Sequence, residues 1–243
     1  MKVSVFEDPH RLAGAAAEEF ARRAREAVER TGSFTVALAG GSTPRETYRR
    51  LAEEYATMVE WSRVHFFFGD ERGVPPGSED SNYRMASEAL LSRVPAGGVH
   101  RIRGERPPEE AAALYEAELH RFFGVRRRPP EMDLILLGLG DDGHTASLFP
   151  KTPALRERRR WVVANPVEKL STTRITLTLP VINAARAVMF LVAGEGKAKA
   201  LKMVLEENAD PAEYPARLVR PSGDLTWMVD RAAASLLERV GRG

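Results

Sequence analysis

Short uninterrupted runs of apolar residues recur along the chain, and most of them end at glycine or at a polar turn. Such runs are typical of strands that are buried on both faces of a parallel sheet. They predict strands at residues 3–6, 34–39, 64–68, 134–137, 188–193 and 225–229. Two further segments, 161–164 and 174–178, are rich in β-forming residues, and the second alternates in polarity.

Between these runs the apolar positions follow a helical period. The clearest case begins after Asp8, with Pro9 in the first turn, and runs to about Arg30 before Gly32. We also expect helices from Pro44 through Leu51, over about 81–92, from Pro107 to about Phe123, from about 198 to about Glu207, and at the C-terminus.

This alternation predicts an α/β fold with a mostly parallel, doubly wound sheet of modified Rossmann type and helices on both faces. No repeat or long linker divides the chain, so we expect one domain over residues 1–243. The carboxyl ends of parallel strands lie at one edge of a sheet, where open α/β proteins bind ligands. Four glycine-containing strand endings are expected to meet there, each leading into a helix: 40–44, 69–72, 138–144 and 194–197.

Composition narrows the class of protein. With 43% hydrophobic and 29% charged residues, the chain of 243 residues is predicted to be globular. A net charge of +2 gives no reason to expect a nucleic-acid partner, and no apolar run approaches the length of about 20 residues that spans a bilayer. The absence of cysteine excludes disulfides and thiolate chemistry, and the N-terminus does not resemble a signal peptide. We therefore expect a soluble cytoplasmic protein, either a monomer or a weak homo-oligomer.

The segment 132–150 concentrates the chemistry. The loop from Gly138 to Gly143 matches the glycine spacing of dinucleotide-binding loops. Asp141 and Asp142 would place negative charge against a pyrophosphate, and Asn165 stands where an acidic residue should end the next strand, so we reject that interpretation. A Walker loop is also absent, because Gly196-Lys197 is followed by alanine.

His144 is the candidate general base. A single histidine is more often structural, but this one follows Asp142 by two residues at the predicted functional edge. Neutral imidazole, with an unperturbed pKa near ~6.5, can deprotonate water at cellular pH. Asp142 is a candidate for orienting the ring, although it could equally serve only the turn.

Other strand endings supply charge. Asp70 and Arg72 follow a buried strand, and Arg72 is suited to stabilising developing negative charge, unless both only face solvent. Arg174 and Lys197 are candidate partners of a phosphate monoester. The turn formed by Gly40, Gly41, Ser42 and Thr43 before Pro44 offers free backbone N–H groups to an anion, but an ordinary capped turn would need the same residues. No spacing of His, Asp or Glu indicates a metal site.

These motifs together resemble the 6-phosphogluconolactonase family, within the superfamily that also contains glucosamine-6-phosphate deaminase/isomerase. The resemblance covers nearly the whole chain. It rests on residues 40–44, 69–72, 81–84, 137–150, 174–180, 194–198 and 227–230. It implies a glucosamine-6-phosphate deaminase-like fold and hydrolysis of 6-phospho-D-glucono-1,5-lactone to 6-phosphogluconate, the second step of the oxidative pentose phosphate pathway, without cofactor or metal.

By this resemblance, His144 would activate water, with Arg72 close to the substrate and Asp70 nearby. The loop of Ser42 and Thr43, with Arg174 and Lys197, would hold the phosphate. The deaminase branch carries a glutamate that partners its histidine, and Phe149 occupies the corresponding position here. This favours the lactonase over aldose–ketose chemistry. A sugar-phosphate-sensing module without turnover is a second alternative, against which the retained Asp70, Arg72 and His144 argue.

Overall fold

A computed structural model describes residues 1–125 and 127–238. Its strands are β1 Lys2–Phe6, β2 Phe34–Leu38, β3 Val64–Phe68, β4 Asp70–Arg72, β5 Gly98–Val99, β6 Leu134–Leu137, β7 Val162–Val167, β8 Thr172–Leu177, β9 Ala187–Val192 and β10 Asp224–Asp230. Its α-helices are α1 Pro9–Thr31, α2 Ser42–Glu54, α3 Asn82–Ala86, α4 Pro108–Phe123, α5 Leu179–Ala184 and α6 Ala198–Leu205. A π-helical turn, Ser87–Leu91, continues α3.

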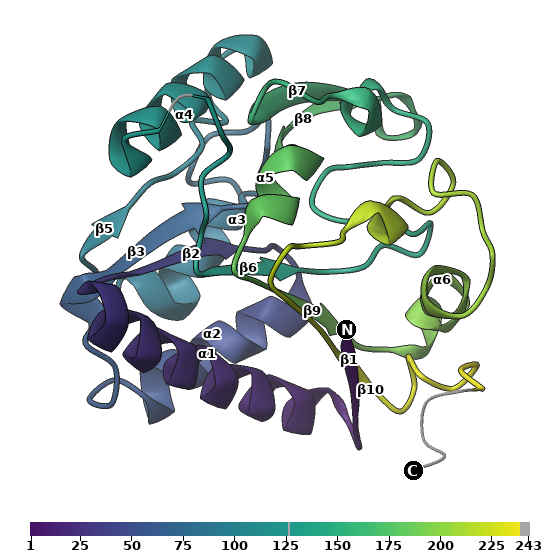
Figure 1. The fold of residues 1–243 in the computed structure, drawn as a ribbon, viewed down its shortest axis with the longest axis horizontal. Helices are drawn as coiled ribbons and strands as arrows, with labels where there is room; N and C mark the ends of the chain where they lie inside the picture. The colour runs from purple at the N-terminus through teal and green to yellow at the C-terminus, as the bar shows by residue number, and fades with distance from the viewer. Residues whose placement is uncertain (126, 239–243) are drawn as a thin grey trace.

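The main sheet has seven strands in the order β1-β10-β9-β6-β2-β3-β5, and every pair in it is parallel. Its central strands are buried along their whole length, as their continuous apolar runs predict. Figure 1 shows α1 and α2 below this sheet and α4, α5 and the small sheet above it. The predicted mostly parallel α/β fold with helices on both faces is confirmed.

The first long helix shows how local sequence fixes an element. The Asp8 carboxylate accepts a hydrogen bond from the backbone N–H of Arg11 at 2.7 Å, and Gly32 ends the helix with a left-handed φ of 80°. The buried face consists of alanines and of Leu12 and Phe20, and Phe20 meets Phe34 of β2 edge to face. Small side chains let the helix lie close to the sheet.

A second sheet changes the predicted topology. Strands β4, β8 and β7 form an antiparallel sheet of three strands, in the order β4-β8-β7. The ending 69–72 therefore enters a strand and not a helix. The ending 138–144 also leads into no helix, since irregular chain with an isolated bridge between Thr145 and Leu148 follows it. After β4 and a loop, the helix predicted over about 81–92 does follow, as α3 and its π-helical continuation, whereas the helix expected after 138–144 was wrong because local turns replace it.

The predicted C-terminal helix is also wrong for the residues that the structure describes. After β10 the chain forms turns over 231–236. The Asp230 carboxylate accepts hydrogen bonds from the N–H groups of Ala233 and Gly194, so it fastens the turn to the end of β9. The rest of the predicted helix lies beyond residue 238, outside the described residues. The sequence also predicts a surface connection in the basic, proline-containing segment 126–130, of which residue 126 lies outside the described residues.

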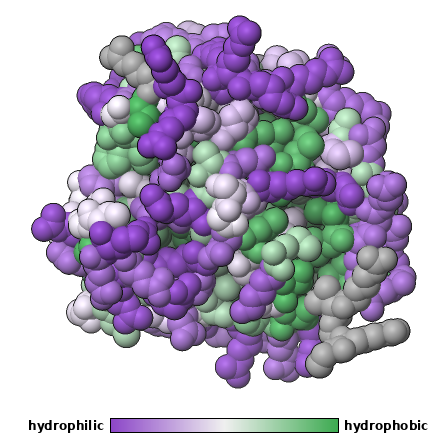
Figure 2. Space-filling model, in the orientation of Figure 1, coloured by the Kyte–Doolittle hydropathy of each residue, from purple (hydrophilic) through white to green (hydrophobic). Residues whose placement is uncertain are grey.

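Polar side chains cover most of the face drawn in Figure 2, with hydrophobic residues visible between them. The buried apolar residues form a core cluster that includes side chains of both sheets, such as Phe66 of β3 and Ile175 of β8. No helix in the described part of the chain combines the length and apolar character that a membrane span requires.

Candidate active site

A cavity of about 220 Å³ lies at the carboxyl ends of β2, β3 and β6, against the strands β4 and β8. Seven of the ten residues predicted from the sequence line it, and six of them are Gly40, Gly41, Asp70, Arg72, His144 and Arg174. Lys197 lines it as well. Asp142 lies behind His144, while Ser42 and Thr43 begin α2 next to the lining glycines. The parallel sheet thus brings distant strand endings together, as expected.

Two buried tyrosines hold the strand ends at this edge. The hydroxyl of Tyr48 donates to the carbonyl of Ala39 and accepts from its N–H, both at 2.9 Å. The hydroxyl of Tyr115 makes the same pair of bonds with Phe68, at 3.1 and 2.8 Å. Burial raises the pKa of both phenols, so they stay neutral and keep their donors. Each tyrosine satisfies backbone groups where the strand stops.

His144 is oriented by Asp142. The Nδ1 atom of the ring lies 2.5 Å from an Asp142 carboxylate oxygen, and the backbone N–H of His144 donates to the same oxygen at 3.1 Å. Although partial burial opposes it, hydrogen bonds from His144 and Lys169 hold the pKa of Asp142 well below its usual range. An ionised carboxylate only accepts, so Nδ1 carries a proton, and in the neutral form of the ring Nε2 keeps its lone pair.

The ring of His144 is also fixed by stacking. Phe149 lies nearly parallel to it, with centroids 4.1 Å apart and an interplanar angle of 23°. Phe149 is buried. Lys169, in the turn between β7 and β8, places its ammonium group 5.8 Å from the centroid of the Phe149 ring and donates a hydrogen bond to Asp142. An aromatic ring therefore packs the histidine at the position where the sequence comparison with the deaminase branch placed a carboxylate.

Two arginines face each other across the small sheet. Arg72 of β4 and Arg174 of β8 are direct partners in the antiparallel register, a like-charge pair that destabilises a sheet unless an anion lies between the charges. Arg72 donates to the carbonyl of Asp80. The Nε and Nη1 atoms of Arg174 are buried and have no hydrogen-bond partner among the described residues. Burial, and then the charge of Arg72, lower the pKa of Arg174.

Asp70 is buried beside these arginines. Its carboxylate accepts from the hydroxyl of Ser147 at 2.6 Å and from the side-chain amide of Asn82 at 3.3 Å. Asn82 and Ser147 both line the cavity, and neither was among the predicted site residues. Their signal was present in the motifs 81–84 and 137–150, but no local rule assigns a role to a single amide or hydroxyl.

Glu71 supports the site from the opposite face of β4. Its buried carboxylate accepts from the N–H groups of Arg72, Asn82 and Tyr83, each at 2.8 Å. Burial raises its pKa, against the effect of these hydrogen bonds. The carboxylate therefore ties the start of α3 to β4, which places Asn82 beside Asp70.

The glycine turn closes the cavity on the side of α2. A side chain at Gly40 would collide with Asn82, since a Cβ atom there would lie 2.0 Å from the amide oxygen. Gly41 has a φ of 108°, precedes the helix, and makes no side-chain cap. The first N–H groups of α2 are left without intrahelical partners, as at every helix start. In the described part of the chain, His, Asp and Glu side chains form no group of three that could hold a metal ion.

Comparison with known proteins agrees with this geometry. The family model described as glucosamine-6-phosphate isomerases/6-phosphogluconolactonase matches residues 7–227. The chain belongs to this family. Among its relatives, a 6-phosphogluconolactonase of Synechocystis sp. is 45% identical over 219 residues, which cover 88% of this chain and 89% of the relative.

Solved structures show the same family fold. A 6-phosphogluconolactonase from Trypanosoma brucei superposes with a TM-score of 0.87 at 32% identity, covering 98% of both chains. One from Thermotoga maritima gives a TM-score of 0.81 at 32% identity over 94% of this chain and 99% of the other. A monomeric glucosamine-6-phosphate deaminase has a TM-score of 0.81 at 23% identity over 97% of this chain and all of that chain, and so shares the fold alone.

Proposed function

We propose that this chain hydrolyses 6-phospho-D-glucono-1,5-lactone to 6-phosphogluconate, the second step of the oxidative pentose phosphate pathway. The observation that carries the proposal is the pair Asp142–His144: Nδ1 of His144 is hydrogen-bonded to the Asp142 carboxylate, and the histidine itself lines the cavity. The similarity to the Synechocystis lactonase over 88% of the chain supports the substrate class.

The reaction requires one proton to move twice. Nε2 of His144 takes a proton from water as the water oxygen adds to the lactone carbonyl, which gives a tetrahedral oxyanion. When the intermediate collapses, the bond from carbon to ring oxygen breaks. The imidazolium then returns its proton to that oxygen, so the open hydroxy acid leaves and His144 is neutral again. Asp142 holds the ring in one tautomer and stabilises its charged form throughout.

The positive charges stabilise two different groups of the substrate. Arg72 is assigned to the oxyanion, with Asp70 beside it as a buried counter-charge. Arg174, Lys197 and the α2 turn of Gly40, Gly41, Ser42 and Thr43 are assigned to the phosphate. The buried Nε and Nη1 donors of Arg174 have no partner among the described residues, which supports this assignment, since a bound phosphate would satisfy them.

We also propose that residues 1–243 act as one cytoplasmic domain, as a monomer or weak homo-oligomer without nucleic-acid or membrane partners. The core cluster, which includes residues of both sheets, supports a single domain. The net charge of +2 supports the absence of a polyanionic partner. Light scattering over a tenfold concentration range tests the oligomeric state, and a tetramer stable on dilution would contradict it.

The function is tested with two substrates side by side. Freshly prepared 6-phosphogluconolactone should be hydrolysed well above its spontaneous rate, whereas glucosamine 6-phosphate should release no ammonia. Phe149 carries the second expectation, because it stacks on His144 and supplies no carboxylate for proton transfer at a sugar carbon. Release of ammonia with fructose 6-phosphate would overturn the proposal. Lactone binding without turnover would instead indicate a sensing module.

A further inference from the structure

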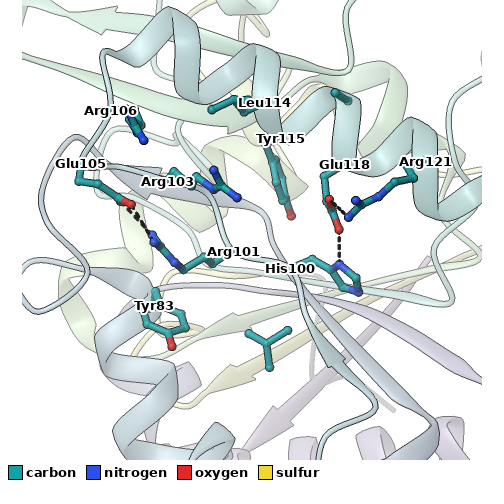
Figure 3. A pocket seen from close by; sticks show the side chains of 12 residues that line it. Tyr83, His100, Arg101, Arg103, Glu105, Arg106, Leu114, Tyr115, Glu118 and Arg121 are labelled. Atoms are coloured by element: carbon teal, nitrogen blue, oxygen red, sulfur yellow. Dashed lines mark hydrogen bonds and ion pairs between the residues drawn. The ribbon is translucent and has the colours of Figure 1, made fainter.

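A second cavity, of about 700 Å³, shares no lining residue with the catalytic pocket. Its walls come from the exposed face of α4, the segment 99–106 that follows the edge strand β5, and Tyr83 of α3 (Figure 3). The proposed reaction uses none of these residues. Arginines and glutamates dominate the lining: Arg101, Arg103, Arg106 and Arg121 with Glu105 and Glu118.

Both glutamates are already neutralised inside the cavity. Arg101 holds Glu105 through two hydrogen bonds, at 2.9 and 2.7 Å. The hydrogen bond from Arg101 lowers the pKa of Glu105 to about 2. Glu118 lies 2.8 Å from Nδ1 of His100 and also accepts from Arg121. These carboxylates therefore have their positive partners and leave the remaining charge of the cavity uncompensated.

That remaining charge belongs to Arg103 and Arg106. In the described part of the chain the side chain of Arg103 makes no hydrogen bond or ion pair, and Figure 3 shows it reaching between Glu105 and Tyr115. Among the described residues, the guanidinium of Arg106 has one ion pair, at 3.8 Å with Glu110, which does not line the cavity. Two guanidinium groups with free donors on one wall are suited to phosphate oxygens.

The same cavity has room for an uncharged portion of a ligand. Val99 and Leu114 are exposed by 40% and 39% although they are apolar, and both line the cavity. The ring of Tyr83 is stacked beneath Arg101, whose guanidinium carbon lies 5.6 Å from the ring centroid. Apolar and aromatic surface beside convergent cations is typical of sites for organic anions.

We propose that this cavity is a second anion site, which takes an organic phosphate with at least two negative charges and a flat or apolar portion. Arg103 and Arg106 bind the phosphate groups, and Val99, Leu114 and Tyr83 contact the organic portion. The ion pairs of Glu105 and Glu118 keep carboxylate charge away from the ligand.

The site adjoins the catalytic pocket through the backbone. Tyr83 follows Asn82, which lines the catalytic cavity, and both N–H groups donate to Glu71. Gly104, which lies between the lining residues Arg103 and Glu105, packs against the carbonyl of Arg72, where an added Cβ would lie 2.2 Å from that oxygen. Occupancy of the second cavity is therefore expected to change the KM for the lactone. This effect on KM rests on the proposed function, whereas the binding of the organic phosphate itself does not.

Titration calorimetry with pyrophosphate and with ADP tests the binding. The wild-type chain should bind two equivalents of pyrophosphate, and Arg103→Ala/Arg106→Ala should lose one of them or bind it at least tenfold more weakly. Arg174→Met, in the catalytic pocket, should lose the other. ADP should bind the second site more tightly than pyrophosphate, and weaker binding of ADP would contradict the organic portion of the proposal.

A charge-matched control separates this site from general attraction. Arg63→Ala/Arg128→Ala removes the same charge from exposed arginines, 59% and 73% accessible, that line neither cavity. This control should keep both equivalents. Equal weakening in the two double variants, or loss of all binding in Arg174→Met, would overturn the proposal. In lactone assays, ADP should raise KM more in the wild type than in Arg103→Ala/Arg106→Ala, and equal effects would refute the link to Arg72.

Discussion

Replacing Arg174 by methionine should stabilise the empty protein while it weakens substrate binding. The guanidinium of Arg174 is buried at Nε and Nη1 without a partner among the described residues, and it faces Arg72 across the strand pair. An unsatisfied buried donor costs about 1–3 kcal/mol. Methionine retains an apolar stem of similar length, so the variant should gain about that free energy of unfolding.

The gain should be visible as a higher Tm in buffer without phosphate. For a chain of this size each kcal/mol shifts Tm by about 2–4 °C, so a rise of several degrees is expected. The loss should appear in KM for the lactone. A hydrogen bond to a charged group is worth about 1.5–3 kcal/mol, which corresponds to a rise of about 10- to 150-fold.

Phosphate titration links the two effects. A ligand at 100 times its Kd stabilises the folded state by about 2.7 kcal/mol, and the wild type should show most of this at the catalytic pocket. Arg174→Met should lose that part. Arg63→Met, an exposed arginine in a local pair with Glu60, is the control and should change neither quantity. A lower Tm in phosphate-free buffer, or an unchanged KM, would refute the reasoning.

Three further predictions follow from the site. Asp142→Asn should lower kcat for the lactone about 10³- to 10⁴-fold, because His144 would adopt the wrong tautomer. Steady-state kinetics measure this loss, with circular dichroism to check that the fold is unchanged, and a loss below tenfold would count against the orienting role of Asp142. Tyr48→Phe should lower the free energy of unfolding by about 1–3 kcal/mol because the backbone groups of Ala39 lose their partner. Tyr55→Phe is the control and should change that free energy little in urea titrations, since the Tyr55 hydroxyl makes no hydrogen bond within the described part of the chain. The pKa of Asp142 is depressed in the folded chain, so its contribution to stability is complete above the unfolded pKa of about 3.9 and is lost as the pH falls toward the folded pKa. Between pH 6 and 3 the urea midpoint should therefore fall less in Asp142→Asn than in the wild type. Parallel curves for the two proteins would disprove this linkage.

The central strands could be predicted from the sequence because burial on both faces leaves an unbroken apolar run. The run 134–137 and the runs of β2, β3 and β9 are of this kind, and their parallel arrangement places their endings at one edge. The first helix was predictable for a different reason, since Asp8 and Gly32 are local start and stop signals.

The small sheet could not be predicted in the same way. Asp70–Arg72 is a short polar segment, and it becomes a strand only because Arg174 and its neighbours, far along the chain, pair with it. The facing arginines and the contacts of Asn82 and Ser147 with Asp70 depend on that pairing. The pairing of His144 with Asp142 could be predicted from the sequence, because a separation of two residues keeps the two side chains close together.

The measurement that tests the central claim most directly is the hydrolysis rate of fresh 6-phosphogluconolactone by His144→Gln, with the spontaneous rate subtracted. Glutamine keeps a polar side chain next to Phe149 but has no basic nitrogen. We predict a fall in kcat of about 10²–10⁴, the usual contribution of a general base, while 6-phosphogluconate binds with nearly unchanged affinity. Hydrolysis at the wild-type rate would contradict the assignment of His144 as the base.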